Sequence, residues 1–387
     1  MFKILTLNNI SVSGLERLPR DRYEIASEIQ NPDAVLLRSF KMHDWEIPAT
    51  LKAVGRAGAG VNNIPIDKIS ARGIPVFNAP GANANAVKEL VLASLLITAR
   101  HLFPAWDYAR RLQGNDAEIS KQVESGKKQF VGCELAKRTL GVIGLGAIGV
   151  KVANAAHALG MQVIGYDPHI TVNNAWQLSA QVKQASSVED VLAQSEFVTL
   201  HVPLVNETRN LINAERLQRT RKGLMLLNFS REGIVEDAAV SEAIKAGKLQ
   251  GYICDFPSNL LINHERVVVL PHLGASTEEA EENCAIMVAD QVRDYLEDGT
   301  VRNAVNFPEV YMTRNGGSRL LVVNKNIPGM IERMSAAVAK ASLNIVNMLN
   351  KSRGEIACNL VDIGSEIPPA VVQDIAGIEG VLNVRVL

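Results

Sequence analysis

Short apolar runs alternate along most of the chain with turn-forming residues and with segments in which apolar residues recur at helical spacing. In the N-terminal part the runs are 3–7, 34–38, 51–55 and 73–77. Buried parallel strands are continuous apolar runs of about this length, and the residues between them suffice for crossover connections. The pattern predicts an α/β unit with its own sheet in this part of the chain.

The same alternation continues further along the chain with longer helical segments between the strands. The predicted strands are 139–143, 161–166, 196–201, 225–229, 251–255 and 267–270. Strands that alternate with amphipathic helices are typical of βαβ units and therefore of a parallel sheet. This part of the chain is expected to form a second α/β unit.

Two further segments carry a distinct pattern. Residues 86–112 are apolar at helical spacing and predict one long helix, buried either within one subunit or, as we expect, against another domain or subunit. After a linker at 303–308, a strand (319–323), a helix (328–341), two strands (344–351 and 355–363), a helix (369–376) and a strand (381–386) are predicted. This order, βαββαβ, is ferredoxin-like. At least a homodimer is expected through the long helix.

Composition narrows the classes of function. The chain has 387 residues, 47% of them hydrophobic, and a net charge of −1, so neither a nucleic-acid nor an anionic-membrane surface is expected. No N-terminal signal and no apolar run long enough to span a bilayer are found in the sequence, which predicts a cytoplasmic protein. The four cysteines are far apart and lack zinc-site spacing, so no metal site is expected.

A glycine motif lies between the first strand and the first helix of the second unit. Gly144, Gly146 and Gly149 form G-x-G-x-x-G, and Asp167 ends the next strand about 20 residues further on. In this context the first glycine makes a tight turn, the second admits a pyrophosphate, and the third packs helix against strand. An acidic residue at that position accepts hydrogen bonds from both ribose hydroxyls and repels a 2′-phosphate, which predicts NAD as the cofactor.

Polar residues follow the strands of both predicted sheets. In the second unit these are Asp167, His201, Ser230, Arg231, Asp255 and His272, and in the first unit they are Arg38, Ser39 and the turn Gly58, Ala59, Gly60. Ligands of open parallel sheets bind outside the carboxyl ends of the strands, so the residues of the second unit are expected to share one cleft. The backbone N–H groups of a glycine-rich turn can bind a carboxylate.

Several of these segments together resemble a known family. The glycine motif with Asp167 is preceded by Gly55–Asn63 and followed by Leu200–Pro203, Asn228–Gly233 and Leu270–Thr277. In this order they resemble the motifs of the D-2-hydroxyacid dehydrogenase family. The resemblance covers nearly the whole chain and is greatest to the members that oxidise 3-phosphoglycerate.

The resemblance implies an α/β fold with three parts. A Rossmann-type NAD-binding domain (95–275) would be inserted in a flavodoxin-like substrate-binding domain (1–94 and 276–308). The C-terminal unit, 317–387, is similar to the ACT domain, an effector-binding module of amino-acid enzymes. Asn326 and Asn344 match its serine-binding pattern, so L-serine is an expected effector, with a purely assembling role for this unit as the alternative.

Residue roles are implied in the same way. Arg231 would bind the substrate carboxylate and polarise its C2 oxygen, and His272 would be the general base. Arg38, Ser39 and Asn83 match positions that hold a substrate phosphate, and Gly58, Ala59 and Gly60 would bind the carboxylate. The cofactor-binding positions would be Gly144, Gly146, Ala147, Ile148, Gly149, Asp167, His201, Val202, Pro203, Ser230, Asp255 and Gly274.

The expected reaction is the NAD-dependent oxidation of 3-phospho-D-glycerate to 3-phosphohydroxypyruvate, which begins L-serine biosynthesis. Another D-2-hydroxyacid dehydrogenase or a hydroxypyruvate reductase is the alternative, followed by a non-catalytic NAD sensor. One departure from the family bears on this choice. The carboxylate that usually orients the histidine is absent after Asp255, where Asn259 stands nearest, and Glu265 is the other candidate.

Overall fold

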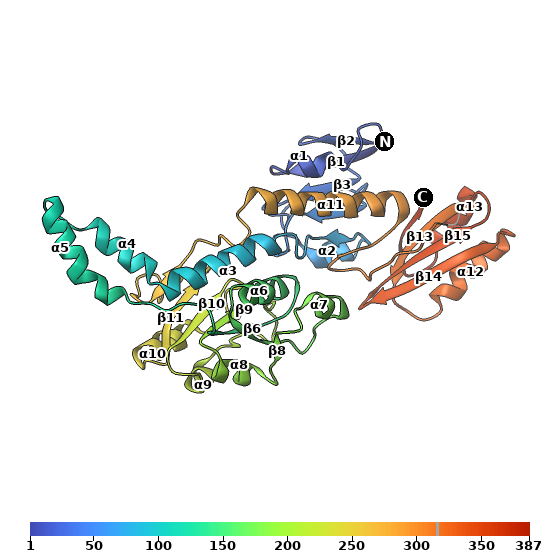
Figure 1. Ribbon diagram of the computed structural model, residues 1–387. Coiled ribbons are helices and arrows are strands. Elements are labelled where there is room, and N and C mark those ends of the chain that lie inside the picture. Colours follow the sequence, from blue (N-terminus) through green and yellow to red (C-terminus); the bar gives the residue numbers. More distant parts are fainter. Residues whose placement is uncertain (315–316) are drawn as a thin grey trace. The chain divides into compact units, whose positions relative to one another are not determined.

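The computed structural model describes residues 1–314 and 317–387, and the chain divides into two compact units (Figure 1). Unit 1 consists of Met1–Asn83 and Glu278–Leu387, and unit 2 of Ala84–Thr277. The domain limits expected from the sequence, 94/95 and 275/276, remain a proposal, since compact packing and division of function need not coincide.

A five-stranded parallel sheet forms the N-terminal part of unit 1. Its strands are β2 (Tyr23–Ala26), β1 (Phe2–Leu7), β3 (Ala34–Leu37), β4 (Ala53–Arg56) and β5 (Val76–Phe77), in that spatial order. This is the doubly wound order of flavodoxin-like sheets. The helices are α1 (Val12–Leu15), α2 (Ile66–Ser70) and the long α11 (Glu278–Asp298), whose buried residues Cys284, Val288, Val292 and Tyr295 belong to the same core cluster as Leu36 and Ala53 of the sheet.

The C-terminal part of unit 1 is the expected βαββαβ unit. It comprises β13 (Ser318–Lys325), α12 (Met330–Lys340), β14 (Ile345–Arg353), β15 (Ile356–Ile363), α13 (Pro369–Ala376) and β16 (Val381–Val386). The strands form an antiparallel sheet in the order β14-β15-β13-β16. Side chains alternate along β13, so that Leu320 and Val322 pack with α12 and α13, whereas Leu321 and Val323 face the other way.

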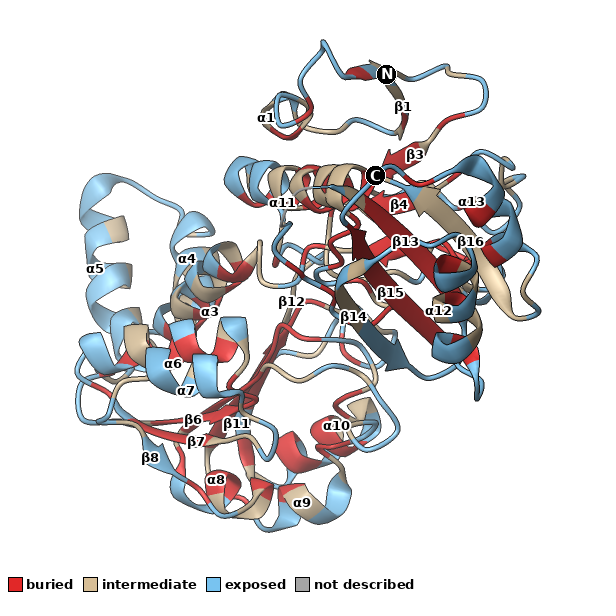
Figure 2. Cartoon of the chain, turned by 90° about the vertical axis from the view of Figure 1, so that its right-hand side faces the viewer, coloured by how far each residue is buried: buried red, intermediate tan, exposed pale blue. Residues whose placement is uncertain are grey.

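This second face of the antiparallel sheet packs against α11. Leu321, Val323, Cys358 and Leu360 belong to one core cluster with Leu296 of α11, and Figure 2 shows the buried strands β13 and β15 beside that helix. The N-terminal sheet, α11 and the C-terminal sheet therefore share a continuous core.

Unit 2 contains a seven-stranded parallel sheet. Its order is β12 (Val267–Val269), β11 (Leu249–Cys254), β10 (Leu224–Asn228), β9 (Phe197–Leu200), β6 (Thr139–Ile143), β7 (Gln162–Tyr166) and β8 (Lys183–Gln184). The connecting helices are α6 (Ala147–Ala158), α7 (Val172–Gln177), α8 (Val188–Gln194), α9 (Ala214–Gln218) and α10 (Asp237–Lys245). The strand order reverses between β6 and β9, which is where open α/β sheets bind ligands.

The single helix predicted over 86–112 is wrong, because the chain forms two helices there. α3 (Ala84–Ala99) packs through Val87, Val91 and Leu95 into the core of unit 2, and α4 (Leu102–Arg110) has no buried residue. His101 lies between them with φ +50°, a left-handed conformation that an α-helix cannot contain. After a turn, α5 (Asp116–Gly126) begins with a capping box from Asn115.

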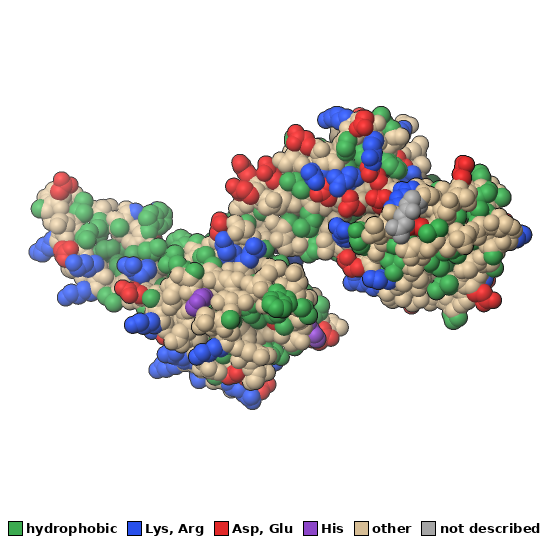
Figure 3. Space-filling model, turned by 45° about the vertical axis from the view of Figure 1, so that its right-hand side comes forward, with side chains coloured by type: hydrophobic (Ala, Val, Ile, Leu, Met, Phe, Trp, Pro, Cys, Tyr) green, Lys and Arg blue, Asp and Glu red, His purple; other side chains and the backbone are tan. Residues whose placement is uncertain are grey.

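Exposed apolar side chains gather on a helical arm, which consists of the end of α3 together with α4 and α5. Leu96, Leu102, Phe103, Trp106 and Val123 are all at least 39% exposed, and Figure 3 shows hydrophobic side chains collected over the arm. None of the described helices combines the length and apolar character needed to cross a membrane.

Candidate active site

The glycine turn connects β6 to α6 as the motif predicts. Gly144 has φ +92°, and a Cβ atom there would lie 2.5 Å from the carbonyl oxygen of His201. A Cβ on Gly149 would lie 1.9 Å from the Gly144 carbonyl oxygen, so helix and turn meet without room for a side chain. Gly146 is the N-cap of α6, and a Cβ there would have no neighbour within 4 Å.

This arrangement fits a dinucleotide. The open space at Gly146 adjoins the N-terminus of α6, where Ala147 and Ile148 begin the helix and free N–H groups favour a phosphate. Asp167 follows β7, and its carboxylate accepts 2.8 Å hydrogen bonds from the N–H groups of Leu145 and His169. A cavity of about 320 Å³ lies beside it, lined by Leu145, Asp167, Ile170 and other residues of unit 2. A nucleoside with its ribose at Asp167 suits this cavity.

His201 follows β9 and is held as a neutral imidazole. Burial lowers its pKa to about 3. Nε2 lies 3.0 Å from the hydroxyl of Thr199, and the buried Nδ1 has no hydrogen-bond partner in the described part of the chain. Val202 and Pro203 continue from it, with a Val202 methyl 2.9 Å from the Cβ position at Gly144.

The loop after β10 presents Arg231. Asn228 holds this loop and is 2% exposed. Its side-chain oxygen accepts from the Ser230 N–H (3.1 Å), and its side-chain nitrogen donates to the Arg231 carbonyl (3.0 Å). The Ser230 hydroxyl donates to the Leu200 carbonyl and ties this loop to the end of β9. Arg231 is exposed, and among the described residues its guanidinium donates one hydrogen bond, from Nη1 to the Ser230 carbonyl. The remaining guanidinium N–H groups can bind a carboxylate in a fork.

His272 follows β12 at the same edge of the sheet. Asp255, at the end of β11, is 1% exposed and accepts hydrogen bonds from the N–H groups of Leu273 (2.8 Å) and Gly274 (2.7 Å). Asp255 therefore holds the loop that carries His272. All the predicted strand-end residues of unit 2 lie at the carboxyl edge of one parallel sheet.

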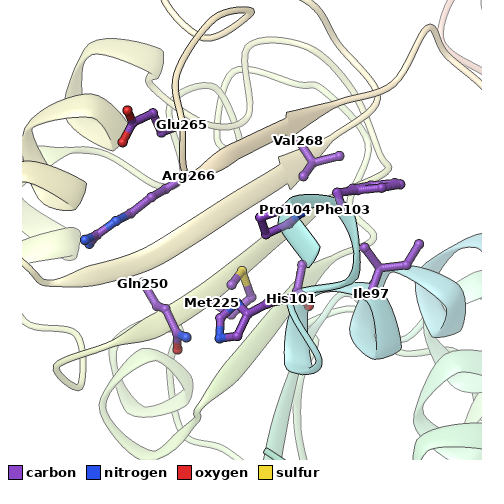
Figure 4. Close-up of a pocket in the computed structure, with 10 residues that line it drawn as sticks. Ile97, His101, Phe103, Pro104, Met225, Gln250, Glu265, Arg266 and Val268 are labelled. Carbon is purple, nitrogen blue, oxygen red and sulfur yellow. The ribbon is translucent and has the colours of Figure 1, made fainter. Parts of the chain in front are cut away.

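The two candidates for the absent carboxylate do not contact His272. Glu265 lines a different cavity of about 380 Å³ with Arg266, Met225 and others, as Figure 4 shows. Asn259 is exposed and makes no side-chain hydrogen bond to any described residue. The aromatic ring of Phe256 lies against the imidazole instead.

The substrate-binding candidates of unit 1 surround the end of β3. Arg38 forms an ion pair with Glu281 of α11, with Nη1 and Oε1 2.5 Å apart. Ser39 is oriented by its N–H, which donates to Asn8 Oδ1 at 3.1 Å. Arg56, at the end of β4, donates Nε to the Arg38 carbonyl at 3.0 Å. Two arginines therefore meet at this edge of the five-stranded sheet.

The turn 58–60 is close to these arginines. A Cβ atom on Gly58 would lie 2.0 Å from Nη1 of Arg56, so a side chain there would displace the guanidinium from its present position. The Ala59 carbonyl accepts a 2.6 Å hydrogen bond from Asn78, and Gly60 completes the turn. Asn83 is the last residue of this segment of unit 1 and is half-buried.

The two effector candidates are not brought together within one chain. Asn326 follows β13 at the end of the sheet where Lys325 pairs with Ile356. Asn344 precedes β14 at the opposite end, where Ile345 pairs with Ile363. Over residues 1–314 and 317–387, no group of three or more His, Cys, Asp or Glu residues is arranged to hold a metal ion.

Comparison with known proteins agrees with this geometry. Residues 102–274 match the model for the D-isomer specific 2-hydroxyacid dehydrogenase, NAD binding domain. A D-3-phosphoglycerate dehydrogenase from Haemophilus influenzae is 34% identical over 354 residues, which are 88% of this chain and 82% of that protein. The chain belongs to the D-isomer specific 2-hydroxyacid dehydrogenase family.

Other members of this dehydrogenase family extend the comparison. A D-3-phosphoglycerate dehydrogenase from Synechocystis is 36% identical over 330 residues, but this chain spans only 56% of its length. The NAD-bound 3-phosphoglycerate dehydrogenase structure from Entamoeba histolytica has a TM-score of 0.60 at 26% identity and covers 79% of this chain and 98% of its own. Unit 2 is thus the NAD-binding domain of a 2-hydroxyacid dehydrogenase, as the glycine motif predicts.

Sequence reasoning assigned no site role to Asn228 or Phe256, and it named Arg56 only as the start of a strand-end turn without its contact. Asn228 holds the Arg231 loop, Arg56 contacts the Arg38 carbonyl, and Phe256 contacts His272. Asn228 also stands at a strand end, so the rule that located the other candidates could have found it. The ring contact of Phe256 has no counterpart in the sequence pattern.

Proposed function

We propose that this protein oxidises 3-phospho-D-glycerate to 3-phosphohydroxypyruvate with NAD, the first step of L-serine biosynthesis. The observation that carries the proposal is the shared edge of the seven-stranded sheet. Arg231 and His272 lie there together with the glycine turn and Asp167. The names of the relatives in Synechocystis and Haemophilus influenzae support phosphoglycerate as the substrate.

Each side chain has a distinct task in this reaction. NAD, when bound, accepts the hydride from C2 of the substrate. Arg231 binds the substrate carboxylate and the C2 oxygen with its free guanidinium N–H groups. Its positive charge stabilises the partial negative charge on that oxygen as the hydroxyl becomes a carbonyl. His272 accepts the proton of the C2 hydroxyl as the hydride leaves, and returns it in the reverse direction.

The phosphate is assigned to Arg38, Ser39 and Asn83. A guanidinium with hydroxyl and amide donors suits a phosphate dianion, and the N–H groups of Gly58, Ala59 and Gly60 would receive the carboxylate. Another D-2-hydroxyacid dehydrogenase or a hydroxypyruvate reductase would not require these phosphate contacts. The choice therefore rests on whether phosphorylated and unphosphorylated substrates are distinguished.

The C-terminal sheet is proposed to act as an ACT-type regulatory unit. A serine site made from both Asn326 and Asn344 would need two copies of the chain, because one chain holds them at opposite ends of the sheet. We propose a homodimer or higher oligomer, with the exposed apolar arm as the contact surface. All four cysteines are free, which fits the proposed cytoplasmic location.

The test is a direct assay of the purified full chain. NADH formation is followed with NAD and 3-phospho-D-glycerate in the presence of a reagent that traps the keto product, and D-glycerate serves as the unphosphorylated comparison. The wild type is expected to turn over the phosphorylated substrate, and His272→Gln is expected to lose at least about a hundredfold in kcat while it still binds NADH. Turnover of D-glycerate alone would favour the alternative dehydrogenases, and NADH binding without any turnover would favour the NAD sensor.

A further inference from the structure

His272 is held in an unusual backbone conformation. Its φ is +57°, in the left-handed region that residues other than glycine seldom occupy. Such a conformation persists where surrounding contacts maintain it. Here the buried Asp255 carboxylate accepts the next two N–H groups of the chain, from Leu273 and Gly274. The direction in which the His272 side chain leaves the backbone is therefore set by Asp255.

The imidazole ring itself contacts a different residue. The ring of Phe256 packs against it in a T-shaped arrangement, with centroids 5.2 Å apart and planes at 67°. No described residue donates or accepts a hydrogen bond at the His272 ring, and Glu265 and Asn259 lie elsewhere. Phe256 thus contacts the imidazole with a defined ring geometry.

We propose that Phe256 is the positioning residue of His272 and takes over the orienting part of the role that the family assigns to a carboxylate. This inference rests on the proposed function, in which His272 is the base. Phe256 and Asp255 are consecutive, so the end of β11 sets both the backbone and the ring of His272. An aromatic ring orients the imidazole without a hydrogen bond and leaves both ring nitrogens available.

The proposal predicts an effect on turnover that is separate from substrate binding. If Phe256 keeps one ring nitrogen directed at the C2 hydroxyl, loss of the aromatic ring lets the imidazole rotate away from the reacting geometry. The Michaelis constant for substrate depends on other side chains and should stay the same. Phe256 is only half-buried, so Phe256→Leu should fold, and Phe256→Tyr keeps the ring as a matched control.

Two measurements on the full-length chain test this proposal. The first compares kcat and KM: Phe256→Leu is expected to lower kcat about tenfold or more with KM within about twofold, and Phe256→Tyr to stay near the wild type. The second uses NMR of protein labelled with ¹³C at histidine. The chain has only 7 histidines, so the His272 signal can be assigned by its loss in His272→Gln. Phe256→Leu should remove the ring-current shift of that signal, and Phe256→Tyr should keep it.

The outcomes separate this inference from the proposed function. An unchanged kcat in Phe256→Leu, or equal losses in the Leu and Tyr variants, would overturn the positioning role. An unchanged His272 signal in Phe256→Leu would overturn the ring contact itself. If the wild type turned over no 3-phospho-D-glycerate, the proposed function would fail, while the NMR comparison would still report whether Phe256 holds the imidazole.

Discussion

At the scale of single residues, the contact between Arg38 and Glu281 gives a test of substrate choice. Both side chains are partly exposed, so their ion pair is worth little and a phosphate dianion can displace the carboxylate. Arg38→Ala is expected to raise KM for 3-phospho-D-glycerate at least about tenfold, and KM for D-glycerate much less. Glu281→Gln should lower KM for the phosphorylated substrate, because it frees the guanidinium. Steady-state kinetics with both substrates test whether Arg38 binds the phosphate. Equal increases in KM for the two substrates in the Arg38 variant would refute this assignment.

His201 predicts how stability depends on pH. Burial lowers the pKa of the folded imidazole to about 3, whereas an imidazole in the unfolded chain binds a proton near pH 6.5. Unfolding therefore takes up a proton between these values, and the free energy of unfolding falls as the pH is lowered from about 6.5 toward 3. The contribution of one such group to the slope approaches about 1.4 kcal/mol per pH unit.

Urea unfolding at several pH values checks this contribution. His201→Gln should flatten the pH dependence, because glutamine cannot take up a proton. His157→Gln, at an exposed position on α6, should keep the wild-type slope. Identical slopes for the wild type and the His201 variant would mean that the imidazole is solvated in the native state.

Residue positions were easier to predict from the sequence than residue partners. The rule for parallel sheets located Asp167, Arg231 and His272 at one edge, because it needs only the ends of strands. The pairing of Arg38 with Glu281 depends on how α11 packs, and the acidic segment 278–282 carries no sign of it. The left-handed conformation of His272 likewise follows from tertiary contacts with Asp255 and not from the local sequence.

At the scale of elements, two substitutions in the turn between β6 and α6 are expected to distinguish an effect on cofactor binding from an effect on stability. A methyl group at Gly146 meets no protein atom, and the φ of this residue, −75°, suits alanine. Gly146→Ala should therefore keep the thermal midpoint within a few degrees and lose at least about tenfold in NADH affinity, since the methyl occupies the space for the pyrophosphate. Gly149→Ala should instead lower stability by about 1–3 kcal/mol, because its methyl meets the Gly144 carbonyl.

Thermal unfolding and fluorescence titration with NADH measure the two effects separately. The Gly149 variant is the matched control, because both substitutions add one methyl group to the same turn. If Gly146→Ala bound NADH as tightly as the wild type, the turn would not contact the pyrophosphate.

Periodicity predicted the type of most elements and failed at the break between two consecutive helices. The C-terminal helices and strands match their predicted ranges closely, since β13 is a continuous apolar run and apolar positions repeat at helical spacing along α12. The apolar repeat across 86–112 can be followed past Arg100 and His101, so periodicity alone does not reveal the left-handed residue that separates α3 from α4. Pro104 is the signal that could have placed the break, because proline suits the first turn of a helix and not its interior.

At the scale of the whole molecule, the C-terminal sheet is part of the core of unit 1. The continuous apolar runs of β13 and β15 indicate two buried faces for this sheet, but they cannot say that α11 covers one of them. Charged groups also lie in this contact. Arg319 and Asp362 form a bidentate pair at 2.6 and 2.9 Å with both side chains 1% exposed, and Arg319 also donates to the Asp298 carbonyl at the end of α11.

Arg385 of β16 gives the means to test this packing. Its Nη2 donates to the carbonyls of Tyr295 (3.1 Å) and Leu296 (2.8 Å) in the last turn of α11, and its guanidinium lies 5.0 Å from the Tyr295 ring centroid. A cation at a helix C-terminus satisfies carbonyls that have no partner within the helix. Arg385→Met is expected to lower the free energy of unfolding of unit 1 by about 2 kcal/mol, since bonds from charged donors contribute more than neutral ones.

Thermal unfolding with and without NADH assigns the effect to a unit. NADH should raise the transition of unit 2 because it binds the folded state there. Arg385→Met should lower the transition to which unit 1 contributes. Lys340→Met, which removes an exposed ion pair with Asp374, is the control and should change stability by less than about 1 kcal/mol. If Arg385→Met destabilised only a separate C-terminal transition and left the N-terminal sheet and α11 unaffected, the C-terminal sheet would be an independently folding module attached to unit 1. A single shifted transition would mean instead that the N-terminal sheet, α11 and the C-terminal sheet unfold as one cooperative unit, as their shared core cluster implies.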